Sequence, residues 1–147
     1  MNQPNTFNNH RLLLYYKGDI SALTLFVQHN SGNICFPESL PALSEILEAE
    51  QCETGKVSVH PSAMVNAINR LLQLDNDLLR AEPGFSEQID TPGGIITVHM
   101  ARFMLLDPPH KLIQSRDCKL KTLVELRGRP PAEMELLRRA YVKVMES

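Results

Sequence analysis

The 147-residue chain has no tryptophan, only 5% aromatic residues and three cysteines. The shortage of aromatic side chains argues against a surface that stacks unpaired nucleic-acid bases. Cys35, Cys52 and Cys118 are too few, and odd in number, for a disulfide framework, so we expect three free thiols. Cys118 stands among basic neighbours that favour a thiolate, and the sequence therefore predicts that it is the most reactive of the three.

Long apolar segments are also missing. No apolar run approaches the roughly 20 residues of a membrane-spanning helix. The first ten residues, MNQPNTFNNH, lack the basic and apolar segments of a secretory signal. Their polar composition predicts a disordered tail over residues 1–10, followed by a single domain over residues 11–147. We therefore expect a cytoplasmic protein that does not engage a membrane.

Motifs that carry a specific chemistry are absent from the sequence. None of the five histidines is spaced tightly with another histidine or a cysteine, as metal ligands often are. Neither a G-x-S-x-G nucleophile elbow nor a phosphate-binding glycine loop is present. We accordingly predict no catalytic residue, no metal and no cofactor, and favour a protein that is not an enzyme.

What the sequence does contain is an uneven charge distribution. The net charge of −2 divides into −6 over residues 1–109 and +5 over residues 110–143. Such asymmetry is typical of a site for an anionic partner, and it equally arises when two parts of one domain attract each other. The basic quarter supplies two candidate binding residues, Arg127 and Arg129.

Hydrophobic periodicity and turn residues predict the secondary structure. Strand-forming residues on both sides of the turn Lys17-Gly18-Asp19 favour a hairpin over residues 11–28, with a helix over 20–28 as the alternative. A short strand is expected over residues 33–36, and another, or merely an entry to a helix, over 57–59. Apolar residues at helical spacing predict four helices, over 40–50, 62–80, 119–127 and 131–145.

The stretch TPGGIITVHMARFMLLDPPH, residues 91–110, sets His99 and Arg102 into an apolar run. Its composition favours a strand over residues 95–105, covered on both faces. A strand sends His99 and Arg102 to opposite faces, whereas a helix would make them neighbours. A charge cannot be buried alone, so Arg102 is expected to pair with a carboxylate or to meet a ligand or second subunit.

Together these patterns predict an α+β fold in which a small, mostly antiparallel sheet packs against a long central helix, with a C-terminal helical pair. The favoured function is a non-catalytic protein that recognises another macromolecule, as a homodimer. A second hypothesis is a small-molecule enzyme or ligand carrier with a cleft beside residues 95–106, using His99 or Arg102. A third is nucleic-acid binding, since the basic C-terminal pair resembles a helix-turn-helix in outline.

Overall fold

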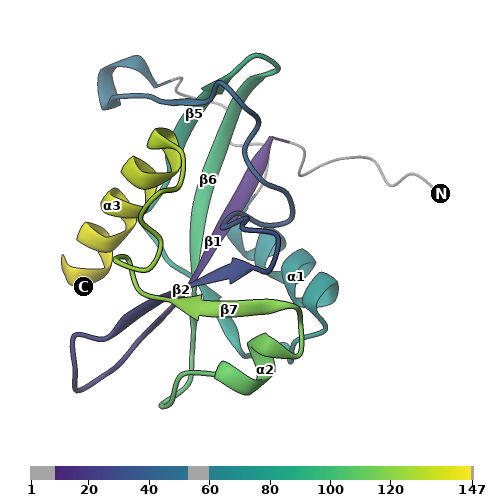
Figure 1. Ribbon diagram of the computed structural model, residues 1–147. Coiled ribbons are helices and arrows are strands. Elements are labelled where there is room, and N and C mark those ends of the chain that lie inside the picture. Colours follow the sequence, from purple (N-terminus) through teal and green to yellow (C-terminus); the bar gives the residue numbers. More distant parts are fainter. Residues whose placement is uncertain (1–8, 53–59, 147) are drawn as a thin grey trace.

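The computed structural model describes residues 9–52 and 60–146. In these ranges a seven-stranded mixed sheet forms the middle layer, with helices on both of its faces (Figure 1). The strands are β1 His10–Lys17, β2 Thr24–His29, β3 Glu45–Ile46, β4 Leu79–Ala81, β5 Glu87–Thr91, β6 Gly94–Phe103 and β7 Cys118–Lys121. The helices are the 3-10 turn η1 Ala49–Gln51, α1 Pro61–Leu72, α2 His110–Gln114 and α3 Pro131–Glu146.

Strand β1 lies at the centre of the sheet, in the order β3-β5-β6-β1-β2-β7, and β4 pairs with β6 beyond the end of β5. It runs parallel to β6 and antiparallel to β2. Its sequence HRLLLYYK is apolar at successive positions and almost entirely buried. A strand of that kind is stable only where both faces of the sheet are covered.

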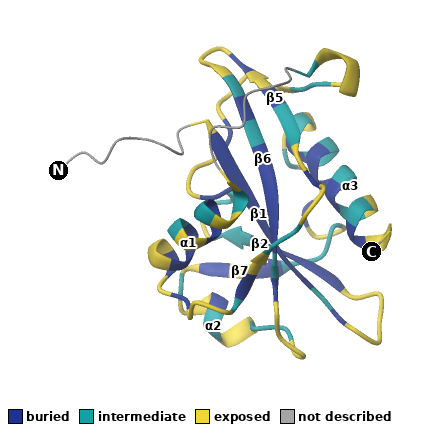
Figure 2. Cartoon of the chain, turned by 180° about the vertical axis from the view of Figure 1, so that it is seen from behind, coloured by how far each residue is buried: buried dark blue, intermediate teal, exposed yellow. Residues whose placement is uncertain are grey.

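The two faces of the sheet carry two separate apolar cores. Alternate side chains of β1 take part in each, with Leu12 and Leu14 on one face and Leu13 and Tyr15 on the other. Helices α1 and α2 cover the first face, and α3 covers the second (Figure 2). Each helix presents an apolar stripe to the sheet, and this burial is the main stabilising contribution of a layered domain.

Several predicted elements are confirmed. The hairpin of residues 11–28 is formed by β1 and β2, and the alternative helix over 20–28 is absent from this described segment. The preferred strand over 95–105 corresponds to β6, and the helix over 131–145 to α3. All three cysteines are free thiols. Over residues 33–36 the structure has only an isolated bridge between Leu12 and Phe36, and the segments 57–59 and 1–8 lie outside the described residues.

Other helix predictions are wrong. The helix expected over residues 40–50 is replaced by the short strand β3 and the turn η1, and Leu43 adopts a left-handed backbone with φ 63°. The helix expected over 62–80 ends at Leu72, because Gln73 is left-handed with φ 53°. Leu79 then pairs with Phe103 as part of β4, so tertiary pairing overrides the apolar spacing of this segment.

The C-terminal helical pair is also wrong. Residues 118–121 form β7, an antiparallel neighbour of β2, in which Cys118 and Leu120 point into the core. A turn over residues 123–128 follows in place of a helix. The resemblance to a helix-turn-helix is therefore lost, because the first of its two helices, expected over residues 119–127, is not formed.

The predicted architecture as a whole, a small and mostly antiparallel sheet on one long central helix, is therefore contradicted by a seven-stranded mixed sheet between helical layers. The prediction failed because it counted strand segments as helices. Residues 40–50, 79–80 and 118–121 belong, in part or whole, to strands. In the described residues, no helix combines the length and the apolar character needed to cross a membrane.

Candidate functional site

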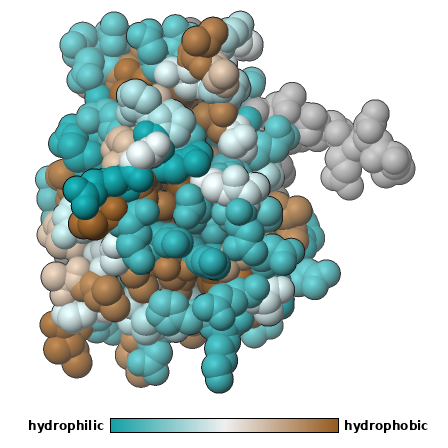
Figure 3. Space-filling view, in the orientation of Figure 1, coloured by the Kyte–Doolittle hydropathy of each residue, from teal (hydrophilic) through white to brown (hydrophobic). Residues whose placement is uncertain are grey.

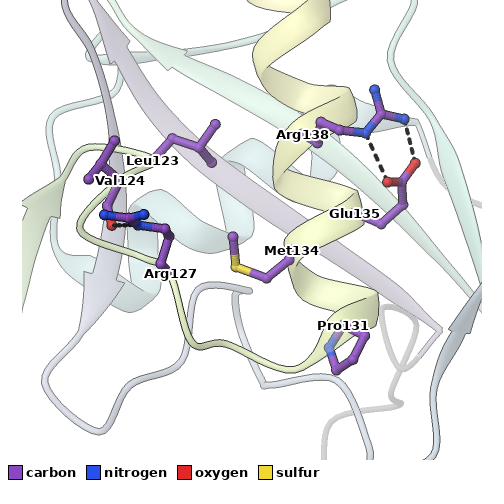
Figure 4. Close-up of a pocket in the computed structure, with 7 residues that line it drawn as sticks. All are labelled: Leu123, Val124, Arg127, Pro131, Met134, Glu135 and Arg138. Carbon is purple, nitrogen blue, oxygen red and sulfur yellow. Dashed lines mark hydrogen bonds and ion pairs between the residues drawn. The ribbon is translucent and has the colours of Figure 1, made fainter.

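A hollow of about 560 Å³ lies between the turn that follows β7 and the first half of α3. We call it the α3 groove; its lining residues, drawn in Figure 4, are Leu123, Val124, Arg127, Pro131, Met134, Glu135 and Arg138. Met134 reaches from α3 toward Leu123 and Arg127 on the facing turn (Figure 4). The groove is therefore apolar inside, with charged groups at its margin.

The turn of residues 122–128 is held in place by its own side chains. The backbone N–H of Thr122 donates to Glu125 Oε1 at 2.8 Å, and the N–H of Glu125 donates to Thr122 Oγ1 at 3.2 Å. Leu126 is buried in the α3-side core and anchors the turn from below. Val124, which is 64% exposed, is thereby presented to solvent beside α3. An exposed valine fixed on a rigid turn is suited to meet another apolar surface.

Arg127 gives the groove an available positive charge. Its Nε donates to the carbonyl oxygen of Val124 at 3.4 Å, a bond that holds the side chain over the turn. In the described part of the chain, no carboxylate forms an ion pair with Arg127. A guanidinium offers five donors, so most of them remain for an external anion.

Glu135, on the opposite side of the groove, has its charge compensated. Arg138 donates to both of its oxygens, at 2.9 and 2.6 Å, and Arg139 donates to Oε2 at 2.8 Å. Hydrogen bonds from Arg138 and then Arg139 lower the pKa of Glu135 to about 2. The carboxylate therefore stays ionised at neutral pH, where it holds no proton to donate and is too weak a base to take one up.

The surroundings of the groove are positive. Residues 119–139 contain six Lys/Arg and three Glu, a net charge of +3. Lys119 and Lys121 of β7 line a smaller, polar hollow of about 300 Å³ next to the loop of residues 28–32. The field at this end of the molecule favours an anionic partner.

Arg129 does not join Arg127 in the groove. Its Nε donates to Glu133 Oε1 at 2.9 Å, and this carboxylate side chain is only 7% exposed. A Cβ placed on Gly32 would lie 3.0 Å from Arg129 Nη1, so the guanidinium packs closely against that glycine. Arg129 also borders a separate hollow of about 480 Å³ between residues 39–44 and the start of α3. The main interaction of Arg129 is therefore its ion pair with Glu133 inside the domain.

His99 and Arg102 lie elsewhere again. They point to opposite faces of β6, as a strand requires, so they do not form one site. His99 stacks on His10, and burial followed by the nearby His10 lowers its pKa to about 4. Arg102 donates to the Lys17 carbonyl and to Asp19 Oδ1, both at 3.2 Å. None of these three hollows is lined by residues 95–106.

Part of the charge asymmetry is satisfied inside the domain. Arg139 of α3 bonds to Glu87 at 2.6 Å and to Glu48 at 2.9 Å, and so joins the basic C-terminal part to the acidic first part. The sequence prediction missed the apolar groove residues, because Leu123 and Val124 were placed in the helix expected over residues 119–127. Thr122 and Glu125 have the spacing of a capping box, which marks a helical turn that begins at Thr122 and so separates this segment from residues 119–121.

No group of three or more His, Cys, Asp or Glu in residues 9–52 and 60–146 is arranged to hold a metal ion. Comparison of the chain with protein-family models and with curated proteins gives no match. The functional interpretation therefore rests on the geometry of the groove.

Proposed function

We propose that this protein is a non-catalytic binding protein whose α3 groove accepts an acidic segment of a protein partner that also carries an apolar side chain. The observation that carries the proposal is the position of Arg127, a guanidinium without a carboxylate partner, at the margin of an apolar hollow. An apolar anchor would contact Val124 and Met134, while a neighbouring carboxylate would pair with Arg127. Such a combination gives affinity from burial and specificity from charge.

The chemistry of the groove supports binding rather than catalysis. Its charged groups are two arginines and Glu135, which two arginine side chains keep ionised. Neither arginine releases a proton near neutral pH, and no Ser, Thr, Cys, His or Lys lines the hollow. The apolar lining also favours a peptide over nucleic acid, whose backbone offers phosphates but few aliphatic groups. We further propose a cytoplasmic location, which three free thiols suit.

The direct test is fluorescence anisotropy with a labelled helical peptide composed of leucine and glutamate. At low salt the peptide should bind, and Arg127→Asp should weaken binding by about tenfold or more, because attraction becomes repulsion. Val124→Asp should have a similar effect by making the groove polar. A matched control is Arg70→Asp, an exposed arginine of α1 on the other face of the sheet.

A second peptide, in which serine replaces leucine, should bind much more weakly. Absence of binding by the leucine-containing peptide at low salt would contradict the proposal. Equal loss of binding in Arg127→Asp and Arg70→Asp would do so as well, since it would mean that net charge alone attracts the peptide.

A further inference from the structure

A second apolar surface lies at one end of the sheet. It consists of two loop segments, residues 18–23 between β1 and β2 and residues 104–107 after β6, which we call the loop tip. Five large apolar side chains are exposed there: Ile20, Leu23, Met104, Leu105 and Leu106. Figure 1 shows both loops projecting from the lower end of the molecule, and in Figure 3 brown surface reaches this end.

The loop tip is a built feature, because polar bonds attach each of its two segments to the sheet. β1 and β6 are parallel neighbours, with Tyr15 opposite Arg102, so their loops leave the sheet at the same end. Arg102 holds residues 18–23 by donating to the Lys17 carbonyl and to Asp19. The hydroxyl of Tyr16 holds residues 104–107 by donating to the carbonyl oxygen of Leu106. The apolar side chains are thus displayed on an ordered support.

The charge of the loop tip is opposite to that of the α3 groove. Residues 18–23 and 104–107 contain two aspartates and no lysine or arginine. Asp19 is already paired with Arg102, whereas Asp107 is exposed and forms no ion pair within the described ranges. The neighbour of Asp107 in sequence is Leu106, which is 81% exposed. An apolar side chain next to an available carboxylate is the combination that we propose for the ligand of the α3 groove.

We infer that the partner of the α3 groove is a second copy of this chain, whose loop tip enters the groove with Leu106 against Val124 and Met134 and with Asp107 paired to Arg127. This inference rests on the proposed function of the groove. Two observations support it. The charge of the loop tip is opposite to that of the α3 groove, and the loops project from the molecule whereas the groove is hollow. The one contact would cover both the α3 groove and the loop tip.

Because the proposed contact uses one loop tip and one groove, we expect a weak association that depends on protein concentration. Each copy carries one loop tip and one groove, which makes the contact heterologous unless two copies exchange tips reciprocally. In either case both surfaces are required, and a change to one of them is sufficient to block self-association.

The test is sedimentation velocity of the full chain over a series of concentrations at low salt. The wild-type chain should show a weight-average sedimentation coefficient that rises with concentration. Asp107→Arg and Arg127→Asp should each abolish the rise, because like charges then meet in the contact. An equimolar mixture of these two variants should regain it, since each restores the missing opposite charge to the other. Arg70→Asp should behave as the wild type.

Recovery in the mixture supports the inference, and circular dichroism of each variant verifies that the fold is intact. A chain that stays monomeric at every concentration overturns it, as does self-association that neither variant alters. The leucine–glutamate peptide separates the two proposals. If the peptide binds the groove while the chain remains monomeric, the self-association is refuted and the proposed function stands, whereas failure of the peptide to bind refutes the proposed function itself.

Discussion

His10 Nδ1 lies 3.3 Å from His99 Nε2, and the two imidazole rings are stacked with their planes 13° apart. The pair arises because β1 and β6 are parallel neighbours, and this pairing brings His10, the first residue of β1, beside the middle of β6. Both rings are more than nine-tenths buried. Two charged imidazoliums at this distance would repel each other, so the pair is a feature of the neutral form.

The first prediction concerns the pH dependence of stability. Burial lowers the pKa of His99 to about 4 and also lowers that of His10. The unfolded chain protonates these rings near pH 6.5, so below that pH the folded state binds fewer protons and loses stability as pH falls toward 4. The contribution of His99 is on the order of 2 kcal/mol. Thermal unfolding between pH 7.5 and 4.5 measures it.

His99→Gln should flatten this dependence, because the remaining side chain does not titrate. His110→Gln, at the exposed start of α2, is the matched control and should leave the slope unchanged. A slope that His99→Gln does not reduce would show that other groups cause the loss of stability in acid.

The second prediction concerns the thiols. Burial, followed by the charge of Glu133, raises the pKa of Cys35 to about 12, and burial followed by Asp117 raises that of Cys118 to about 11. The burial and raised pKa of Cys118 oppose the prediction from its basic neighbours that it is the most reactive cysteine. A shift to about 11 leaves roughly two orders of magnitude less thiolate than an ordinary cysteine has near neutral pH.

We therefore expect a maleimide at pH 7.5 to modify one thiol rapidly, that of the half-buried Cys52. The other two should react only after unfolding in urea. Cys52→Ser should abolish the fast phase in mass spectrometry of the intact protein. Rapid modification of Cys118 in that variant would mean that β7 opens readily from the sheet.

The cysteines illustrate what the sequence could and could not predict. Lys119 and Lys121 are neighbours of Cys118 in sequence, but the strand alternation places their side chains on the other face of β7. The apolar pattern of this segment was recognised, but it was interpreted with the period of a helix instead of the period of a strand. In a four-residue strand too few positions exist to separate a repeat of two from one of 3.6. The strongly periodic α3 had enough positions and was predicted correctly.

The candidate site shows the same limit. The sequence singled out Arg127 and Arg129 for their charge alone. The sequence could not show that Glu133 pairs with Arg129 while Arg127 stays available, because the turn that carries Arg127 was predicted as helix. Nor could it place Asp107 and Asp19 at one end of the sheet, since that depends on the parallel pairing of strands more than 80 residues apart.

The third prediction concerns Arg102. The sequence required a partner for it, and Asp19 is that partner, but the pair is at the surface, with side-chain exposures of 30% and 61%. Exposed ion pairs contribute about 0 to 1 kcal/mol. Arg102→Met should therefore lower the free energy of unfolding in urea by no more than about 1 kcal/mol, much less than a buried pair would. Its Nε atom is buried without a hydrogen-bond partner among the described residues, which also limits the loss.

The larger effect of Arg102→Met should be local. Without the bonds to Lys17 and Asp19, amide hydrogens of residues 18–23 should exchange faster, because the hairpin loop loses its attachment to β6. Arg80→Met is the control, since Arg80 faces Arg102 on the neighbouring strand β4 and is exposed. Unchanged exchange in residues 18–23 would show that the loop is held by other contacts.

The fourth prediction concerns Arg139, which joins three parts of the fold. Its guanidinium bonds to Glu135 on the same helix, to Glu87 of β5, and to Glu48 and the Leu47 carbonyl in the segment before η1. Only 17% of its side chain is exposed. Arg139→Met keeps the apolar stem and leaves three carboxylates close together without their shared partner. We expect the free energy of unfolding to fall by about 2 kcal/mol, less than for a fully buried pair because Glu48 remains in water.

Arg138→Met is the matched control one position earlier on the same helix. Among the described residues, Arg138 pairs only with Glu135, three residues before it, and 61% of its side chain is exposed, so its loss should cost much less than the loss of Arg139. Urea unfolding of the two variants at pH 7 compares them directly. If Arg139→Met costs no more than Arg138→Met, α3 is held to the sheet by the apolar contacts of Leu136, Leu137 and Ala140 alone.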